Sequence, residues 1–135
     1  MSARKVVRVR DIMQREFDLI DGMATVESAL NNMAHPTTRC MIVNKRHEDD
    51  EFGIVLLSDI ARKVLAKNRA IERVNVYEIM EKPVITVGPD MDIRYCARLF
   101  DRFKVSRAPV VEDGTVVGVV GFTDMVIRGM KTPIT

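Results

Sequence analysis

The sequence contains few of the residues that build cross-linked, membrane-spanning or base-stacking proteins. Its two cysteines, Cys40 and Cys96, lie far apart with no histidine at metal spacing, which excludes a disulfide framework and a zinc site. Tryptophan is absent and aromatic residues make up 5%, which argues against stacking on single-stranded nucleic acid. No apolar run approaches the ~18 residues that a membrane span needs. We therefore expect no membrane-spanning segment.

The charges that are present nearly cancel. The 135 residues carry a net charge of +2, with 47% apolar and 30% charged residues, which is the composition of a soluble globular domain. This balance predicts neither a nucleic-acid partner nor a membrane surface as partner. The charged start of the chain has no apolar stretch behind it, unlike a secretory signal, so we expect a cytoplasmic protein.

The sequence shows no catalytic machinery. His35 and His47 have no nucleophile or orienting acid at a recognisable spacing. Phosphate-binding loops of the GxxxxGK type and GxGxxG motifs are absent, and the acidic run at 47–51 lacks calcium-loop spacing. We predict a protein that is not an enzyme, with no catalytic residue, no metal site and no required cofactor.

What the sequence does contain is an internal repeat. Residues 9–13 (VRDIM) recur 67 residues later at 76–80 (VYEIM). At the same offset, residues 26–33 and 93–100 carry apolar side chains at i, i+3, i+4 and i+7, which predicts two amphipathic helices. Thr25 and Asp92 precede these helices and are residue types that cap helix N-termini.

The repeat continues through two strands and a second helix. Residues 39–43 (RCMIV) match 107–111 (RAPVV) at an offset of 68, and 53–59 (GIVLLSD) match 118–124 (GVVGFTD) at an offset of 65. The first copy has a longer loop at 44–52, where the second has a tight turn at 112–114. With final helices at 59–67 and 124–130, each copy is predicted to be a β-α-β-β-α unit of an α/β fold.

These features predict the domain organisation. We expect an N-terminal extension at 1–8, a first copy at 9–67, an ordered polar linker at 68–75, a second copy at 76–130 and a tail at 131–135. A half of roughly 60 residues buries its own apolar faces poorly, so we expect the two copies to pack face to face around one shared core.

The doubled motifs resemble a tandem cystathionine-β-synthase (CBS) domain pair, the Bateman module, over about residues 6–130. The resemblance implies two repeats around a pseudo-twofold axis, with two clefts that accept adenosine-containing ligands, and it implies a homodimer. We therefore predict a stand-alone regulatory sensor of AMP, ADP, ATP or S-adenosylmethionine that acts on an unknown protein target. The sequence leaves open the number of phosphates, the occupancy of each cleft and the dimer arrangement.

The end of each copy supplies the main candidate residues. Asp59 and Asp124 directly precede the predicted final helices, where free amides favour phosphate, and their carboxylates suit the paired hydroxyls of a ribose. Ser58 and Thr123 can donate to a phosphate oxygen. The alternative is that each pair is an ordinary helix cap.

The candidate residues of the second copy suit an adenosine ligand better. A predicted entry strand at 84–87 supplies an apolar surface for adenine, whereas the first copy has a charged Asp18 in that region. We therefore expect the cleft that contains Asp124 to be the main site. Arginines at strand entries suit bidentate phosphate binding. The predicted nucleotide-binding residues are Asp124, Thr123, Arg107, Ala108, Pro109, Ile85, Thr86, Asp59, Ser58, Arg39 and Ile20.

Two other functions remain as alternatives. The first is a ligand-free dimerisation or scaffold module whose clefts no longer bind ligand, which the substitutions in the first copy favour. The second is nucleic-acid binding through basic residues at the N-terminus and near the first final helix, namely Arg4, Lys5, Arg8, Arg10, Lys63, Lys67, Arg69 and Arg73.

Overall fold

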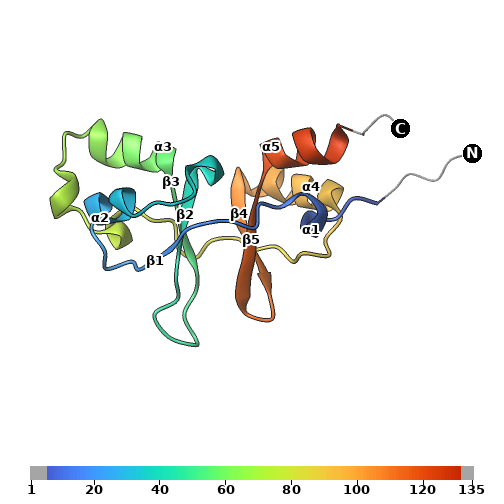
Figure 1. Cartoon of the computed structure of the whole chain (residues 1–135), viewed down its shortest axis with the longest axis horizontal. Helices are drawn as coiled ribbons and strands as arrows, with labels where there is room; N and C mark the ends of the chain where they lie inside the picture. Colours follow the sequence, from blue (N-terminus) through green and yellow to red (C-terminus); the bar gives the residue numbers. More distant parts are fainter. Residues whose placement is uncertain (1–5, 132–135) are drawn as a thin grey trace, which may run out of the picture. The chain divides into compact units, whose positions relative to one another are not determined.

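The computed structural model describes residues 6–131, so Arg4 and Lys5 of the basic N-terminus lie outside the described residues. The chain divides into two compact units, one built from residues 6–15 with 85–131 and the other from residues 16–84 (Figure 1). Each unit combines a small sheet with helices. This confirms the predicted α/β class.

The unit of residues 16–84 holds a three-stranded sheet. β1 (Leu19–Ile20) runs parallel to β2 (Cys40–Val43), which pairs antiparallel with β3 (Gly53–Leu56). The hydroxyl of Thr25 accepts a hydrogen bond from the Ser28 amide at 3.0 Å, which confirms the predicted cap of the first helix. The helices of this unit are α2 (Val26–Asn31), α3 (Leu57–Ile60) with its π-helical continuation Ala61–Leu65, and the 3₁₀ helices Pro36–Thr38, Ile71–Arg73 and Val76–Glu78.

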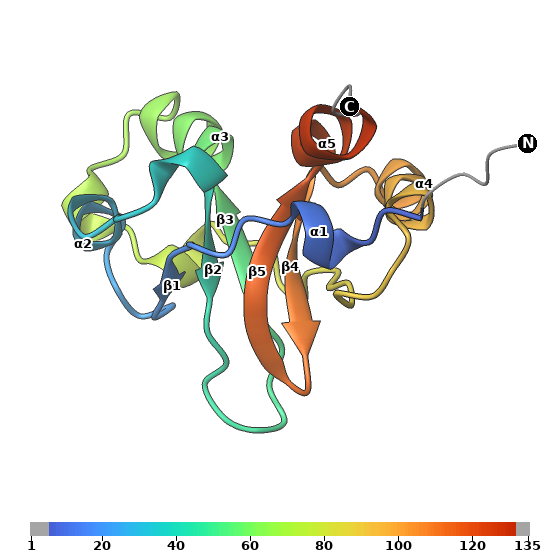
Figure 2. The ribbon, with the colours of Figure 1, turned by 45° about the vertical axis from the view of Figure 1, so that its right-hand side comes forward.

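The unit of residues 6–15 and 85–131 holds the hairpin of β4 (Arg107–Glu112) and β5 (Thr115–Gly121). Asp113 and Gly114 both have positive φ (51° and 77°), as a tight Asp-Gly hairpin turn requires. Figure 2 shows α5 following β5 directly. Asp92 caps the helix that begins at Ile93, because its Oδ1 accepts a hydrogen bond from the Arg94 amide at 2.9 Å. The helices here are α1 (Val9–Ile12), α4 (Ile93–Phe103) and α5 (Phe122–Asp124), which continues as a π helix over Met125–Met130.

The entry strand predicted at 84–87 does not form. Only Val87 pairs there, in an isolated parallel bridge with Val110. Val87 donates to the Pro109 carbonyl at 3.1 Å and accepts from the Val111 amide at 2.9 Å. The cis peptide between Lys82 and Pro83 immediately precedes this segment. The Val84 amide instead donates to the Phe52 carbonyl, at 3.2 Å, in the unit of residues 16–84.

The two sequence copies exchange their starting segments. Val9 and Ile12, from the first copy, are buried in the core cluster of Phe100 and the other second-copy residues. Val76 and Ile79, from the second copy, are buried in the cluster of α2, β2 and β3. The recurring VxDIM and VxEIM motifs thus complete the core of the unit that holds the opposite copy. Each unit therefore has a buried apolar cluster of its own.

The cysteines have packing roles, as expected. Cys40 and Cys96 are both free and buried. Burial raises the pKa of the Cys96 thiol to about 11, which keeps it protonated and unreactive at neutral pH. Among residues 6–131, no helix is long and apolar enough to cross a membrane, and no cluster of histidine, cysteine and acidic side chains has the arrangement of a metal site.

Candidate functional site

Strand pairing shows that the two predicted arginines are not equivalent. In the second copy, Arg107 pairs with Gly121. The first-copy residue that corresponds to Gly121 is Leu56, and it pairs with Cys40 rather than with Arg39. The Leu57 amide donates to the Arg39 carbonyl at 3.0 Å, and the Phe122 amide makes the same bond, at 3.1 Å, to Ser106. The offset between the copies is therefore 67 at this strand, and the predicted match at 68 is wrong. Only the second copy has an arginine at the first position of its strand.

Arg39 lies outside β2 and has an unusual backbone. Its φ of 59° and ψ of 19° are left-handed, at the end of the 3₁₀ helix Pro36–Thr38. This conformation costs a residue with a Cβ atom roughly 1 kcal/mol or more, and the penalty is much smaller for glycine. Left-handed residues that are not glycine occur where the surrounding structure forces the conformation.

Replacing Arg39 by glycine is expected to stabilise the protein. Arg39→Gly should raise the free energy of unfolding by about 0.5–1 kcal/mol, because the relief of strain exceeds the extra chain entropy of glycine. Urea unfolding followed by circular dichroism measures the change. Arg39→Ala is the control, since alanine removes the side chain and keeps the strain. An equal gain in both variants would contradict a backbone origin.

Asp124 holds the start of the last helix. The helix begins at Phe122, two residues earlier than predicted, so Asp124 lies inside its first turn. Its Oδ2 accepts from the Gly121 amide at 2.9 Å, and its Oδ1 accepts from Gln14 Nε2 at a longer 3.3 Å. Each carboxylate oxygen can accept more than one hydrogen bond. The carboxylate is therefore fixed in position by neutral donors and keeps capacity for further donors.

Arg107 and Thr123 lie near this carboxylate. A Cβ atom at Gly121 would be 3.2 Å from Arg107 Cγ and 3.5 Å from Asp124 Oδ2, so both side chains border this glycine. Thr123 is exposed in the first turn of α5. The Arg107 and Asp124 side chains thus border the same glycine, and Thr123 directly precedes Asp124 in the sequence. Figure 2 shows this end of the β4–β5 hairpin, where α5 begins. A larger side chain at position 121 would meet the Arg107 and Asp124 side chains.

The remaining predicted residues of this unit lie along β4. Ala108 is fully buried in the core, so its side chain does not face solvent. The Pro109 carbonyl is used by the Val87 amide. Because the Val87–Val110 bridge is parallel, Ile85 and Thr86 lie toward the Arg107 end of β4, where Thr86 is exposed. Ala108 and Pro109 follow Arg107 on β4, where they pair with Val120 and Val119.

The matching aspartate of the other unit has a different environment. Asp59 accepts from the Leu56 amide at 3.1 Å and forms an ion pair with Arg62 at 3.2 Å. Its side chain is only 7% exposed, whereas Asp124 is half-buried. Ser58 is exposed in the first turn of α3, which also begins two residues before the predicted start. The charge of Asp59 is therefore compensated within its own helix.

Ile20 does not join the group of Arg39, Ser58 and Asp59. It pairs with Val43 at the end of β2, whereas Arg39 precedes the beginning of that strand and bonds to the first residue of α3. The structure thus places Ile20 at the opposite end of β2 from the aspartate.

Gln14 is a residue that the sequence reasoning missed. Its backbone forms an antiparallel bridge with Val119, through hydrogen bonds of 2.8 and 2.9 Å, and this brings its amide to Asp124. Glu81, at the repeat offset of 67, forms the equivalent bridge with Ile54. In the sequence, both bridging residues stand directly after a VxDIM-like motif, and this shared position was the signal that could have identified Gln14. The Lys63 and Arg128 side chains donate to the carbonyls of Ile79 and Met13.

Comparison with known proteins places these features in a family. A family model described as "CBS domain" matches residues 76–130. The structure of a hexameric CBS-CP12 protein from bloom-forming cyanobacteria is 37% identical, with a TM-score of 0.87, and the match covers 92% of this chain and 72% of that one. A CBS domain pair solved with 5′-methylthioadenosine and S-adenosyl-L-methionine is 26% identical, with a TM-score of 0.75 over 90% of this chain and 94% of that one.

A curated protein is also similar in sequence. An uncharacterised protein of Methanopyrus kandleri is 32% identical over 123 residues, which are 88% of this chain and 61% of the relative. The chain spans about three fifths of the length of the first curated relatives that it matches. The second copy matches the family model, and the solved relatives match both copies over nine tenths of the chain. This chain is therefore a tandem CBS-domain pair and belongs to the CBS-domain family.

Proposed function

We propose that this CBS pair is a regulatory module that binds an adenosine-containing ligand, AMP, ADP, ATP or S-adenosylmethionine, through Asp124. The observation that carries the proposal is the Asp124 carboxylate, which neutral amides hold in place beside Arg107 and Thr123. The solved CBS pair with two adenosine-containing ligands supports the same ligand class. Enzymatic turnover forms no part of the proposal.

Each side chain has a distinct role in this scheme. The two oxygens of Asp124 accept the 2′- and 3′-hydroxyls of the ribose, because each retains an acceptor site beyond its present hydrogen bond. The Arg107 guanidinium binds the anionic end of the ligand, a phosphate or the carboxylate of S-adenosylmethionine. The Thr123 hydroxyl, exposed on the first turn of α5, donates to the same group.

The environment of Asp59 favours a single main site per chain. A ribose hydroxyl at Asp59 has to compete with the Arg62 guanidinium, and an ionic hydrogen bond is stronger than one from a neutral hydroxyl. Asp59 is also nearly fully buried. We infer that Asp59 stabilises α3 and that Asp124 binds the ligand.

Replacing Asp124 by asparagine should abolish most of the ligand affinity. Asp124→Asn keeps one oxygen for the Gly121 amide but removes the charge that receives the ribose hydroxyls. Two hydrogen bonds to a charged group contribute about 1.5–3 kcal/mol each, so affinity should fall by about 100-fold or more. Isothermal titration calorimetry with each adenosine compound measures the dissociation constant and the stoichiometry.

Asp59→Asn is the matched control. It makes the same chemical change at the equivalent position and should leave the dissociation constant and the stoichiometry of one unchanged. Wild-type affinity in Asp124→Asn would show that the ribose contact is misassigned. A stoichiometry of two that falls to one in Asp59→Asn would show that both aspartates bind ligand.

Self-association without a ligand is the second candidate function. The last helix exposes Val126 (53%), Ile127 (56%) and Met130 (70%), and Leu65 is 77% exposed at the equivalent helix of the other unit. Contiguous exposed apolar side chains favour a protein interface. The cyanobacterial relative is hexameric. Light scattering of wild type and of Ile127→Asp tests this, and a monomeric wild type would contradict it.

A further inference from the structure

The loop that distinguishes the first copy from the second has a defined fold. In place of the two-residue turn of the β4–β5 hairpin, residues 44–52 connect β2 to β3. Asp50 organises this loop, because its Oδ2 accepts from the Arg46 amide at 2.9 Å and from Lys82 Nζ at 2.8 Å. The Lys45 ammonium lies 5.0 Å from the centre of the Phe52 ring. Hydrogen bonds from Lys82 and backbone amides hold the pKa of Asp50 well below its usual range, so these contacts persist at neutral pH.

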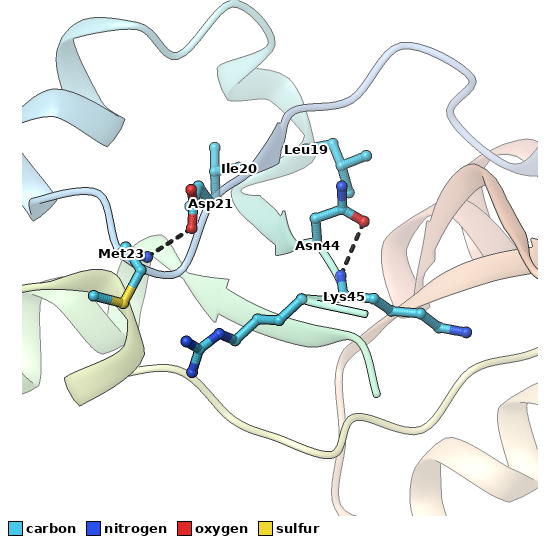
Figure 3. Close-up of a pocket in the computed structure, with 7 residues that line it drawn as sticks. Leu19, Ile20, Asp21, Met23, Asn44 and Lys45 are labelled. Carbon is cyan, nitrogen blue, oxygen red and sulfur yellow. Dashed lines mark hydrogen bonds between the residues drawn. The ribbon is translucent and has the colours of Figure 1, made fainter. Parts of the chain in front are cut away.

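The start of this loop forms one wall of a pocket. The pocket has a volume of about 390 Å³ and is lined by residues 19–21, Met23 and residues 44–46 (Figure 3). The Asn44 amide donates to the Ile20 carbonyl at 2.8 Å, which joins the two walls. The pocket lies at the end of β2 opposite to Asp59, so it is separate from the residues proposed for adenosine binding. Its volume is within the range of small-molecule sites.

The polar groups of the pocket are only partly used by the protein itself. Asp21 Oδ1 accepts from the Met23 amide, and Asn44 Oδ1 accepts from the Lys45 amide, both at 2.9 Å (Figure 3). This leaves the second carboxylate oxygen of Asp21 as acceptor and the Asn44 side-chain nitrogen as donor. Within residues 6–131, the Arg46 guanidinium forms no ion pair. The pocket therefore offers a free guanidinium, a neutral donor and an acceptor beside the apolar side chains of Leu19, Ile20 and Met23.

We propose that this pocket binds a small phosphorylated, hydroxylated metabolite of the sugar-phosphate class. Arg46 binds the phosphate, since a guanidinium matches phosphate oxygens in bidentate geometry. Asn44 donates to a phosphate or hydroxyl oxygen, and Asp21 accepts from a hydroxyl. The acceptor on Asp21 selects a hydroxylated body over a bare anion. The second copy, with its tight turn at Asp113 and Gly114, has no loop from which to build the same pocket.

Ribose 5-phosphate is the probe that tests the proposal. Titration of the ¹⁵N-labelled full chain should shift the amide signals of residues 19–23 and 44–46 in a saturable manner. Arg46→Ala should raise the dissociation constant by about tenfold or more, the loss expected for a hydrogen-bonded charge pair. Asp124→Asn should leave these shifts unchanged, which separates this pocket from the adenosine site.

Three controls keep the test decisive. Arg98→Ala removes an exposed arginine in the other unit, where it packs on Tyr95, and should leave the affinity unchanged. Inorganic phosphate and unphosphorylated ribose should each bind at least about tenfold more weakly than ribose 5-phosphate, because each lacks one half of the contacts. The absence of shifts at residues 19–23 and 44–46 would overturn the proposal. Equal weakening by Arg98→Ala and Arg46→Ala, or equal affinity for ribose, would also overturn it.

Discussion

Phe100→Ala is expected to lower the free energy of unfolding by about 3–5 kcal/mol. Among residues 6–131, Phe100 is the largest fully buried side chain, at 0% exposure, and lies in the core that α1, α4 and the β4–β5 hairpin share. Its ring packs edge-on against Phe122 at 5.3 Å, so truncation also removes an aromatic contact at the start of α5. A loss of this size is a large fraction of the total stability of a domain.

Phe103→Ala provides the matched control for this prediction. Phe103 lies on the same helix but is 53% exposed, so the same chemical change should cost less than about 1 kcal/mol. Urea unfolding monitored by circular dichroism gives both values. Equal losses in the two variants would show that burial does not determine the effect.

Gly118→Val should be nearly as damaging, for a different reason. A Cβ atom at Gly118 would lie 2.8 Å from Met13 Sδ and 2.9 Å from the Gln14 carbonyl oxygen. The backbone of Gln14 has to move, which opens its two hydrogen bonds to Val119. Overpacking costs about 1–3 kcal/mol and each hydrogen bond about 1 kcal/mol, so we expect a loss of about 3–5 kcal/mol.

Thermal unfolding by calorimetry measures the Gly118→Val effect. Gly88→Ala is the control, because a Cβ atom there meets nothing within 4 Å. The same close approach explains why a glycine begins the matching GxVxxxD-like segment of the first copy. A Cβ atom at Gly53 would lie 3.2 Å from the Glu81 carbonyl oxygen. A Gly118→Val variant as stable as wild type would show that the segment around Gln14 does not need to lie this close.

Local chemistry made much of the fold predictable. The i, i+3, i+4, i+7 spacing placed both amphipathic helices, and Thr25 and Asp92 cap them as their side-chain chemistry predicts. The Asp113-Gly114 turn followed from the tolerance of these residues for positive φ. The match of both copies to a known family added the regulatory hypothesis, which local chemistry alone does not contain.

Features set by long-range pairing were not predictable. The letters RCMIV and RAPVV align best at an offset of 68, but the pairing of Cys40 with Leu56 and of Arg107 with Gly121 shows an offset of 67. Periodicity identifies the buried face of a helix but not the element that packs against it. The sequence therefore did not predict that each starting segment packs with the opposite copy. For the same reason the sequence could not place Gln14 beside Asp124 or Ile20 away from Asp59.

The central claim, that this CBS pair binds an adenosine-containing ligand, is tested most directly by thermal unfolding. Purified protein, shown to be free of carried-over nucleotide, is unfolded in the presence of AMP, ADP, ATP, S-adenosylmethionine or GTP in excess. A ligand at about 100 times its dissociation constant adds about 2.7 kcal/mol, which should raise the midpoint by several degrees. The account predicts this shift with at least one adenosine compound and none with GTP. No shift with any adenosine compound would contradict it and leave self-association as the function.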